Sequence, residues 1–332
     1  MFGQREDRAA HLLGQIKADQ ETDPGVARGL AELERRAGRI GAHTEKEGAA
    51  VNFKGTFGFH PLLAYLDESR EALAGILRPG NAAAHGAADQ IAVLEQALEQ
   101  LPREVVADLD TEIVLRADSA GSALGLCQAA RDAKINYLVG FDLTKQVRRA
   151  ILSLPEDAWR PALRQDGSER DGAQVAEITD RLEFYDWPDG SRVIVRRERP
   201  HPGAQLTFTD LDGDAVELER LHRGRANAED RVRAAKQTGL DNLPFREFDL
   251  NAVWLELSLI AQDLGVWTQA LCLDGELAAC EPKTLRYRLL HTAGRLAFHA
   301  RRATLRLQRT WPWAHELAAA FARLTALPPP AR

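Results

Sequence analysis

The stretch EIVLRADSAGSALGLCQAARDAKINYLVGFDLTKQVRRAILSL, residues 112–154, decides the fold class. Runs of β-branched and other apolar residues at 112–117 and 136–141 predict two strands. The segments at 122–133 and 145–154 predict two helices, because their apolar residues recur at helical spacing. A strand, helix, strand, helix series is typical of a sheet covered by helices. The sequence therefore predicts an α/β core.

The chain before this core predicts further strands at 57–67 and 72–77 and a helix at 87–101. Residues 5–38 have the apolar spacing of amphipathic helices. After the core, residues 155–214 are rich in turn-forming residues and contain two alternating runs, which predict a β-rich insert. From residue 215 the predicted elements are helices at 215–237, 245–273 and 281–303, a strand at 304–307, and a helix after Trp313.

These predictions divide the chain into five parts. The parts are a helical N-terminal segment at 1–40, the first half of the core at 41–154, the β-rich insert at 155–214, core helices at 215–273, and a basic helical region at 274–332.

The charge of the chain is distributed unevenly. The 332 residues carry a net charge of −6, with 45% hydrophobic and 28% charged residues, as in a soluble globular protein. Residues 281–332 hold ten Arg or Lys against two acids, a local charge of +8, so the remainder carries −14. A basic end on an acidic body suits contact with a polyanion. The alternative is a basic tail that pairs with acids of its own chain.

Cysteine usage and hydropathy indicate a cytoplasmic protein. Cys127, Cys272 and Cys280 form no CxxC pair, which predicts reduced core thiols. The N-terminus has no apolar signal core. The longest apolar stretch, 252–273, is interrupted by Glu256, and we expect it to form a buried helix and no membrane span.

The strongest chemical motif is His222-x2-Arg225-x3-Glu229-x6-Lys236. In one continuous helix, these offsets place the four side chains within roughly 60° of one another. A carboxylate can bind a divalent metal, and neighbouring cations can bind phosphate. The alternative is a solvated helix face with an ordinary Arg225–Glu229 pair.

Asp118 is the second candidate. It ends a predicted internal strand of an α/β sheet, where ligands gather. The alternative role is a helix N-cap. Together with Glu229 it forms a candidate metal site, and we expect the two carboxylates within roughly 8 Å of each other.

Several longer strings resemble the DDE transposases of bacterial insertion sequences, specifically the group-1 DDE domain, over about residues 40–327. The strings include HTEKEGA at 43–49, KGTFGFHPL at 54–62, LRPGN at 77–81, RADSAG at 116–121, VIVRRERPHPGA at 193–204, NLPF at 242–245, LRYRLLH at 285–291 and TWPW at 310–313.

This resemblance implies an RNase H-like core with a β-rich insert and a two-metal Mg²⁺ site. It implies cleavage and strand transfer at the inverted-repeat ends of an insertion sequence, by a homo-oligomer assembled on nucleoid DNA. Asp118 matches the second acidic residue of the family and Glu229 the third. His222 stands where related transposases have Tyr. The implied DNA contacts are Arg225, Lys236, His222, Arg196 and Arg197.

The sequence departs from the family pattern where the first catalytic Asp belongs. Arg36 occupies that position, and residues 1–40 do not resemble the family. Glu45 or Glu47 replaces the missing acid only if the first strand is threaded differently. We therefore expect an N-terminally truncated or rearranged transposase that is catalytically impaired. The alternatives are a non-enzymatic DNA-binding remnant and a product with no activity.

Overall fold

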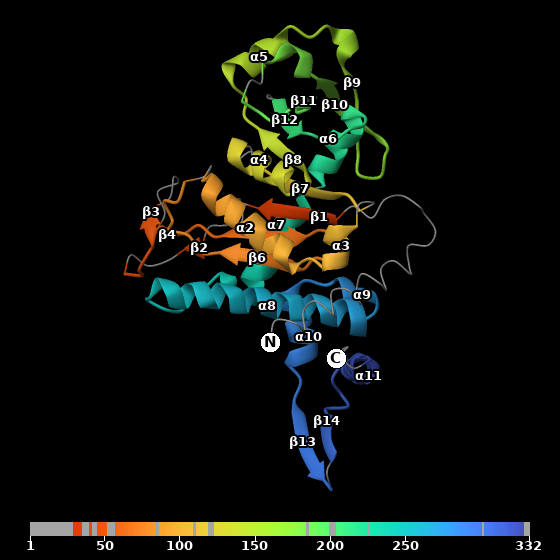
Figure 1. Ribbon diagram of the computed structural model, residues 1–332. Coiled ribbons are helices and arrows are strands. Elements are labelled where there is room, and N and C mark those ends of the chain that lie inside the picture. Colours follow the sequence, from red (N-terminus) through yellow and green to blue (C-terminus); the bar gives the residue numbers. More distant parts are fainter. Residues whose placement is uncertain are drawn as a thin grey trace.

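The structure is a computed structural model of the 332-residue chain (Figure 1). It describes residues 29–34, 40–41, 45–51, 57–83, 86–108, 111–118, 123–183, 186–198, 204–224, 226–300 and 302–328.

A nine-stranded mixed sheet is the framework of the fold. Its strands, in spatial order, are β6 (Ala72–Ile76), β5 (Leu62–Leu66), β1 (Gly29–Glu34), β7 (Ile113–Ala117), β8 (Asn136–Phe141), β12 (Ala204–Thr209), β11 (Arg192–Glu198), β10 (Glu169–Glu177) and β9 (Arg160–Leu163). The strands β1, β7 and β8 are parallel to one another, and every other pairing in this sheet is antiparallel. The strands of the predicted insert thus extend the central sheet through the pairing of β12 with β8.

Helices cover both faces of the sheet. On one face, α2 (Ala87–Gln100), α4 (Leu124–Asp132) and α5 (Lys145–Leu152) bury apolar side chains against β5, β7 and β8. On the other face, α7 (Ala226–Ala235) and α8 (Phe248–Cys272) pack on β5 and β6, and α6 (Ala215–Arg223) packs beside them on β7, β8 and the insert. The predicted α/β class is confirmed in this coarse form, as a large mixed sheet between helices.

The strand β1 corrects a prediction. The sequence predicts helix over residues 5–38, but Gly29–Glu34 form a central strand. Leu, Ala and Glu favour helices on their own, and here β1 pairs with β5 on one side and β7 on the other. Pairing on both edges outweighs local propensity, which is a weak determinant of strands. The other residues of that predicted segment, 5–28 and 35–38, lie outside the described part of the chain.

Two predicted helices are each interrupted. The predicted helix 215–237 is divided into α6 and α7 around Gly224, and a π-helical turn, η4 (Lys236–Leu240), follows α7. The predicted helix 281–303 ends early as α10 (Pro282–Leu290), and the chain continues as strand β13 (Gly294–His299). At Gly294 an added Cβ would lie 3.1 Å from the Leu305 side chain of the neighbouring strand, so this glycine permits close pairing.

The remaining elements are short or peripheral. They are β2 (Ile40–Gly41), β4 (Phe57–Phe59) and β3 (Ala50–Val51) in a small sheet, α3 (Arg103–Ala107), η2 (Glu156–Ala158), η3 (Thr179–Arg181), α9 (Gly275–Ala279), β14 (Arg302–Leu307), which pairs with β13, and α11 (Ala314–Ala326). Figure 1 shows α8 along one side of the sheet and the β13–β14 hairpin projecting beyond it. Among the described helices, none has the length and apolar character needed to span a bilayer.

Candidate active site

The carboxyl ends of β1 and β7 define the site. Asp118 follows β7 directly and is half-buried. The parallel register of β1 and β7 sets Leu33 opposite Ala117, so the backbone of Glu34 lies level with that of Asp118. Two acidic residues therefore occupy equivalent positions at the ends of adjacent parallel strands, where α/β sheets bind ligands.

The C-terminal end of α6 is fastened to the end of β7. The Nη1 atom of Arg116 donates a 2.8 Å hydrogen bond to the Leu221 carbonyl. The Nε2 atom of His222 lies 3.2 Å from the Ala117 carbonyl, and its Nδ1 lies 3.1 Å from the Thr207 hydroxyl. A carbonyl only accepts, so Nε2 carries the proton and Nδ1 can accept from Thr207. His222 thus ties α6 to the residue that precedes Asp118.

A buried ion pair supports this junction. The guanidinium of Arg116 is 1% exposed and lies 2.6 Å from the carboxylate of Asp67, which follows β5. An added Cβ at Gly224 would lie 2.9 Å from Arg116 Nη1, so a larger residue would meet the guanidinium. Glycine at 224 therefore permits the turn between α6 and α7 to approach the sheet. The sequence analysis missed this pair, although a single Arg in the apolar run EIVLRA was its signal.

Glu229 lies just beyond that junction. It is exposed in the first turn of α7, a helix that packs on β1 and β5 through Val232 and Ala235. Asp118 follows β7, and Glu229 lies in the helix that comes after α6, whose C-terminal end is bonded to β7. Their predicted separation of roughly 8 Å stays a prediction.

The predicted four-residue helix face is corrected in part. Because α6 ends at Arg223, His222 belongs to a different helix from Glu229, and its ring is directed to Ala117 and Thr207. Lys236 begins η4, seven residues after Glu229, at roughly 10 Å along a helix axis. Arg225 lies outside the described residues.

The start of α6 is also well fixed. Asp214 caps this helix by accepting hydrogen bonds from the backbone N–H groups of Val216 and Glu217. Arg160 donates to the same carboxylate and holds its pKa below the usual range. The helix that carries His222 is therefore anchored at both ends.

Arg196, predicted as a DNA contact, is held inside the protein. It is buried on an interior strand and pairs with Glu219, at 2.8 Å, and with Glu198. Both partners would have to be given up before Arg196 could contact phosphate. A strand in the middle of a sheet turns every second side chain toward the covering helix, here α6. A role for Arg196 in DNA contact stays a prediction.

Arg197 is half-buried and also held internally. Its guanidinium bonds to Glu156 and Gln174, and its centre lies 4.1 Å from the centroid of a Trp159 ring. Glu156 is mostly exposed, so this pair lies near the surface of the insert. A role for Arg197 in DNA contact stays a prediction.

The two acids predicted as substitutes have a different setting. Glu47 accepts a 3.0 Å hydrogen bond from the Phe248 N–H and so caps the start of α8. Glu45 is exposed in the preceding turn. Arg36, which the sequence predicts at the place of the family's first Asp, lies outside the described residues.

The donor set at the strand ends is of the type that binds a hard divalent cation. Carboxylate oxygens are the ligands that Mg²⁺ favours. Across the part of the chain that the structure describes, no group of three or more His, Cys, Asp or Glu residues is placed to bind a metal. A metal site at Asp118 and Glu229 therefore stays a prediction.

Residues 37–329 match the family model of the transposase DDE domain, group 1. The chain belongs to this family of DDE transposases. DDE transposases cleave and join DNA and generally use divalent metal ions, and this membership confirms the resemblance found in the sequence. No curated protein matches the chain.

The fold of this transposase family member is similar to that of a solved structure. It is a piggyBac transposase synaptic complex with hairpin DNA, with a TM-score of 0.45 and 10% sequence identity. The similarity covers 75% of this chain and 48% of that chain, so this chain spans about half of it.

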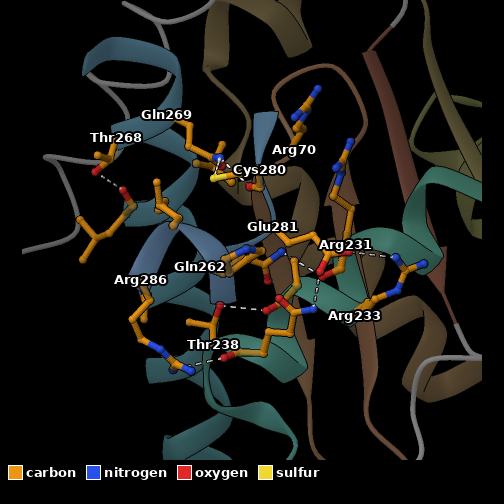
Figure 2. Close-up of a pocket in the computed structure, with 18 of the residues that line it drawn as sticks. Arg70, Arg231, Arg233, Thr238, Gln262, Thr268, Gln269, Cys280, Glu281 and Arg286 are labelled. Atoms are coloured by element: carbon orange, nitrogen blue, oxygen red, sulfur yellow. Dashed lines mark hydrogen bonds and ion pairs between the residues drawn. The ribbon is translucent and has the colours of Figure 1, made fainter. Parts of the chain in front are cut away.

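A cavity of about 620 Å³ lies elsewhere, between α7, α8 and α10 (Figure 2). Its wall contains Arg233, which pairs with Asp230 and, at 3.4 Å, with Glu281. Gln237 donates to the same Glu281 at 3.0 Å. This cavity adjoins a flank of α7 that Glu229 does not line, and we assign no part of the DNA chemistry to it.

Proposed function

We propose that this DDE transposase family member binds the inverted-repeat ends of an insertion sequence and is itself impaired in cleaving them. One observation carries the proposal. His222 and Arg116 bond the C-terminal end of α6 to the end of β7 that precedes Asp118, and α7, with Glu229 in its first turn, follows α6 in the chain.

The sheet supports an RNase H-like core. Its antiparallel strands β6, β5 and β1 continue directly into the parallel strands β7 and β8, with helices on both faces. In this proposal the strands β9 to β12 are the β-rich insert between the second and third acidic positions. The five-part division predicted from the sequence stays part of the proposal.

Asp118 and Glu229 are the residues that would bind Mg²⁺. A bound Mg²⁺ supplies charge neutralisation at the phosphodiester and activates the attacking water or hydroxyl. The protein contributes the position of its carboxylates, fixed by β7 and α7. Impairment follows from the first position, because Arg36 replaces an acid there and a guanidinium stays charged at any physiological pH.

The β13–β14 hairpin is the DNA-binding surface we infer. In the register of the hairpin, Arg295 lies opposite Arg306 and His299 opposite Arg302, so these side chains share one face. All four are exposed, and within the described residues the three arginines have no ion-pair partner. Like charges placed opposite one another destabilise a strand pair, so this face is suited to a bound polyanion. A two-stranded ribbon also fits the DNA major groove.

This hairpin also favours the second candidate, a non-enzymatic DNA-binding remnant. Its basic face needs no metal and no first Asp to bind DNA. The two candidates differ in metal-dependent cleavage, because only the enzyme nicks element ends.

The hairpin predicts a specific change in the salt dependence of DNA binding. In Arg295→Ala/Arg302→Ala/Arg306→Ala, the slope of log affinity against log salt should become shallower by about 2.7, at about 0.9 per phosphate contact. The measurement is a binding titration on a duplex of the inverted repeats that flank the gene, from low to physiological salt.

A matched control removes the same charge from the opposite end of the molecule. Lys145, Arg148 and Arg149 are exposed on α5, which Figure 1 shows at the far end from the hairpin. Their triple alanine variant should keep the wild-type slope. An equal change in both variants would argue for a nonspecific charge effect. A wild-type protein without salt-dependent binding to the repeats would refute the proposed function itself.

A further inference from the structure

The outward side of α8 carries an exposed apolar stripe. The stripe consists of Leu250, Val253, Leu257, Ile260 and Leu264, which are spaced three, four, three and four residues apart. Each of these side chains is between 39% and 55% exposed. Alternating steps of three and four residues are the seam pattern of a helix that packs against another helix.

The inward side of the same helix is unusually polar. It buries Asn251, Ser258, Gln262 and Asp263 against the body of the protein, beside the apolar Leu255 and Leu259. Asn251 exchanges hydrogen bonds with the backbone of Phe245, and Asp263 accepts one from Ala72 N at 2.8 Å. A helix at a water-exposed surface normally keeps its apolar residues inward. The apolar outward stripe of α8 therefore indicates a second surface that becomes covered.

The order of residue types along the stripe is almost the same in both directions of the helix. From its centre at Leu257, the next residues outward are Val253 and Ile260, and then Leu250 and Leu264. A two-fold axis at Leu257 would therefore oppose residues of similar size throughout. Homodimers most often form in this way, with one patch packed on its own copy. We propose that α8 pairs antiparallel with α8 of a second copy of this chain.

The exposed area of the stripe determines whether other residues must also contribute to the interface. Five side chains that are about half exposed supply roughly 150–300 Å² per copy, from about 25 cal/mol per Å² and 1.5–3 kcal/mol for each fully buried side chain. A stable interface buries about 800 Å² per partner. The stripe alone is therefore too small.

The apolar face of the β13–β14 hairpin provides further area. Leu296, Phe298 and Leu305 share the face opposite the arginines and are each more than half exposed. An isolated two-stranded hairpin is marginally stable without a packing partner. Figure 1 shows the hairpin extending past α8 on the side away from the sheet, where the second copy would lie. The apolar face would then pack on that copy and leave the basic face open.

Cysteine cross-linking tests the two-fold arrangement directly. In a Cys280→Ser background, the remaining native thiols are buried, and burial raises the pKa of Cys127 to about 12, so they react slowly. Leu257→Cys should form a disulfide-linked dimer under mild oxidation, because only position 257 meets its own copy. Leu250→Cys and Leu264→Cys should each cross-link poorly alone and well when mixed.

Leu152→Cys is the matched control, since Leu152 is a more exposed leucine, 79%, on a different helix. Cross-linking of Leu257→Cys no faster than this control would overturn the proposal. Strong self-cross-linking of both Leu250→Cys and Leu264→Cys would overturn the antiparallel arrangement. Leu257→Glu should also shift the protein from dimer to monomer in light scattering. These readouts need no DNA, so they fail independently of the proposed function.

Discussion

Replacing Asp67 with alanine is expected to lower the free energy of unfolding by about 3–5 kcal/mol, a large part of the stability of a typical domain. The reason is the charge left behind. Arg116 is 1% exposed, its Nη2 lies 2.6 Å from Asp67, and removal of the carboxylate takes away the negative charge that this buried guanidinium contacts. Chemical denaturation followed by tryptophan fluorescence measures the change.

Two further variants separate this cause from a general loss of charge. Asp171→Ala breaks the exposed pair with Arg164, whose charged atoms are 3.7 Å apart, and should cost no more than about 1 kcal/mol. The double change Asp67→Leu/Arg116→Met removes both buried charges and should recover much of the loss. If Asp67→Ala is no worse than Asp171→Ala, the other contacts of Arg116, among them the hydrogen bond to Leu221, are sufficient to stabilise it.

The elements with strong local signals are the ones that the sequence predicts correctly. The strands at 113–117 and 136–141 are short β-branched or apolar runs bounded by turn residues, and the helix at 87–100 has a regular apolar period. The strand β1 could not be found in this way. Its residues GLAELE favour a helix, and its strand state depends on β5 and β7, which lie far away in the sequence.

The features of the candidate site also differ in whether they have a local sequence signal. Asp118 is predicted because the strand before it is locally encoded, and Glu229 because of its spacing to the neighbouring cations; their roles stay predictions. The break between α6 and α7 could not be predicted, since it depends on how closely Gly224 approaches Arg116. The internal pairing of Arg196 with Glu219 also depends on a contact between distant segments, and sequence reasoning therefore assigned this arginine to DNA.

The chain as it stands is expected not to nick DNA. Purified protein incubated with inverted-repeat ends and Mg²⁺ or Mn²⁺ should give no more nicked product than an Asp118→Ala variant. Two-metal phosphoryl transfer needs several carboxylates to bind and neutralise both ions. In our proposal Arg36 stands in place of the family's first acid, and loss of one member of a catalytic set typically costs about 10⁴-fold or more. A gel assay on end-labelled duplex has the sensitivity to detect a residual activity above the control.

If metal-dependent nicking does occur and is lost in Asp118→Ala, the expectation of impairment is wrong. Another acid must then take the place of the family's first Asp, and mutagenesis can identify it. The backbone register makes Glu34 the first residue to test, because it ends β1 level with Asp118. Glu34→Gln should then abolish nicking, whereas Glu47→Gln should only weaken the start of α8, where Glu47 accepts from Phe248 N. The opposite result would mean that the first strand is threaded differently, with an acid of the 45–47 turn supplied to the metal. Both outcomes rest on one chemical requirement. A third carboxylate must reach the metal site that we propose at Asp118 and Glu229.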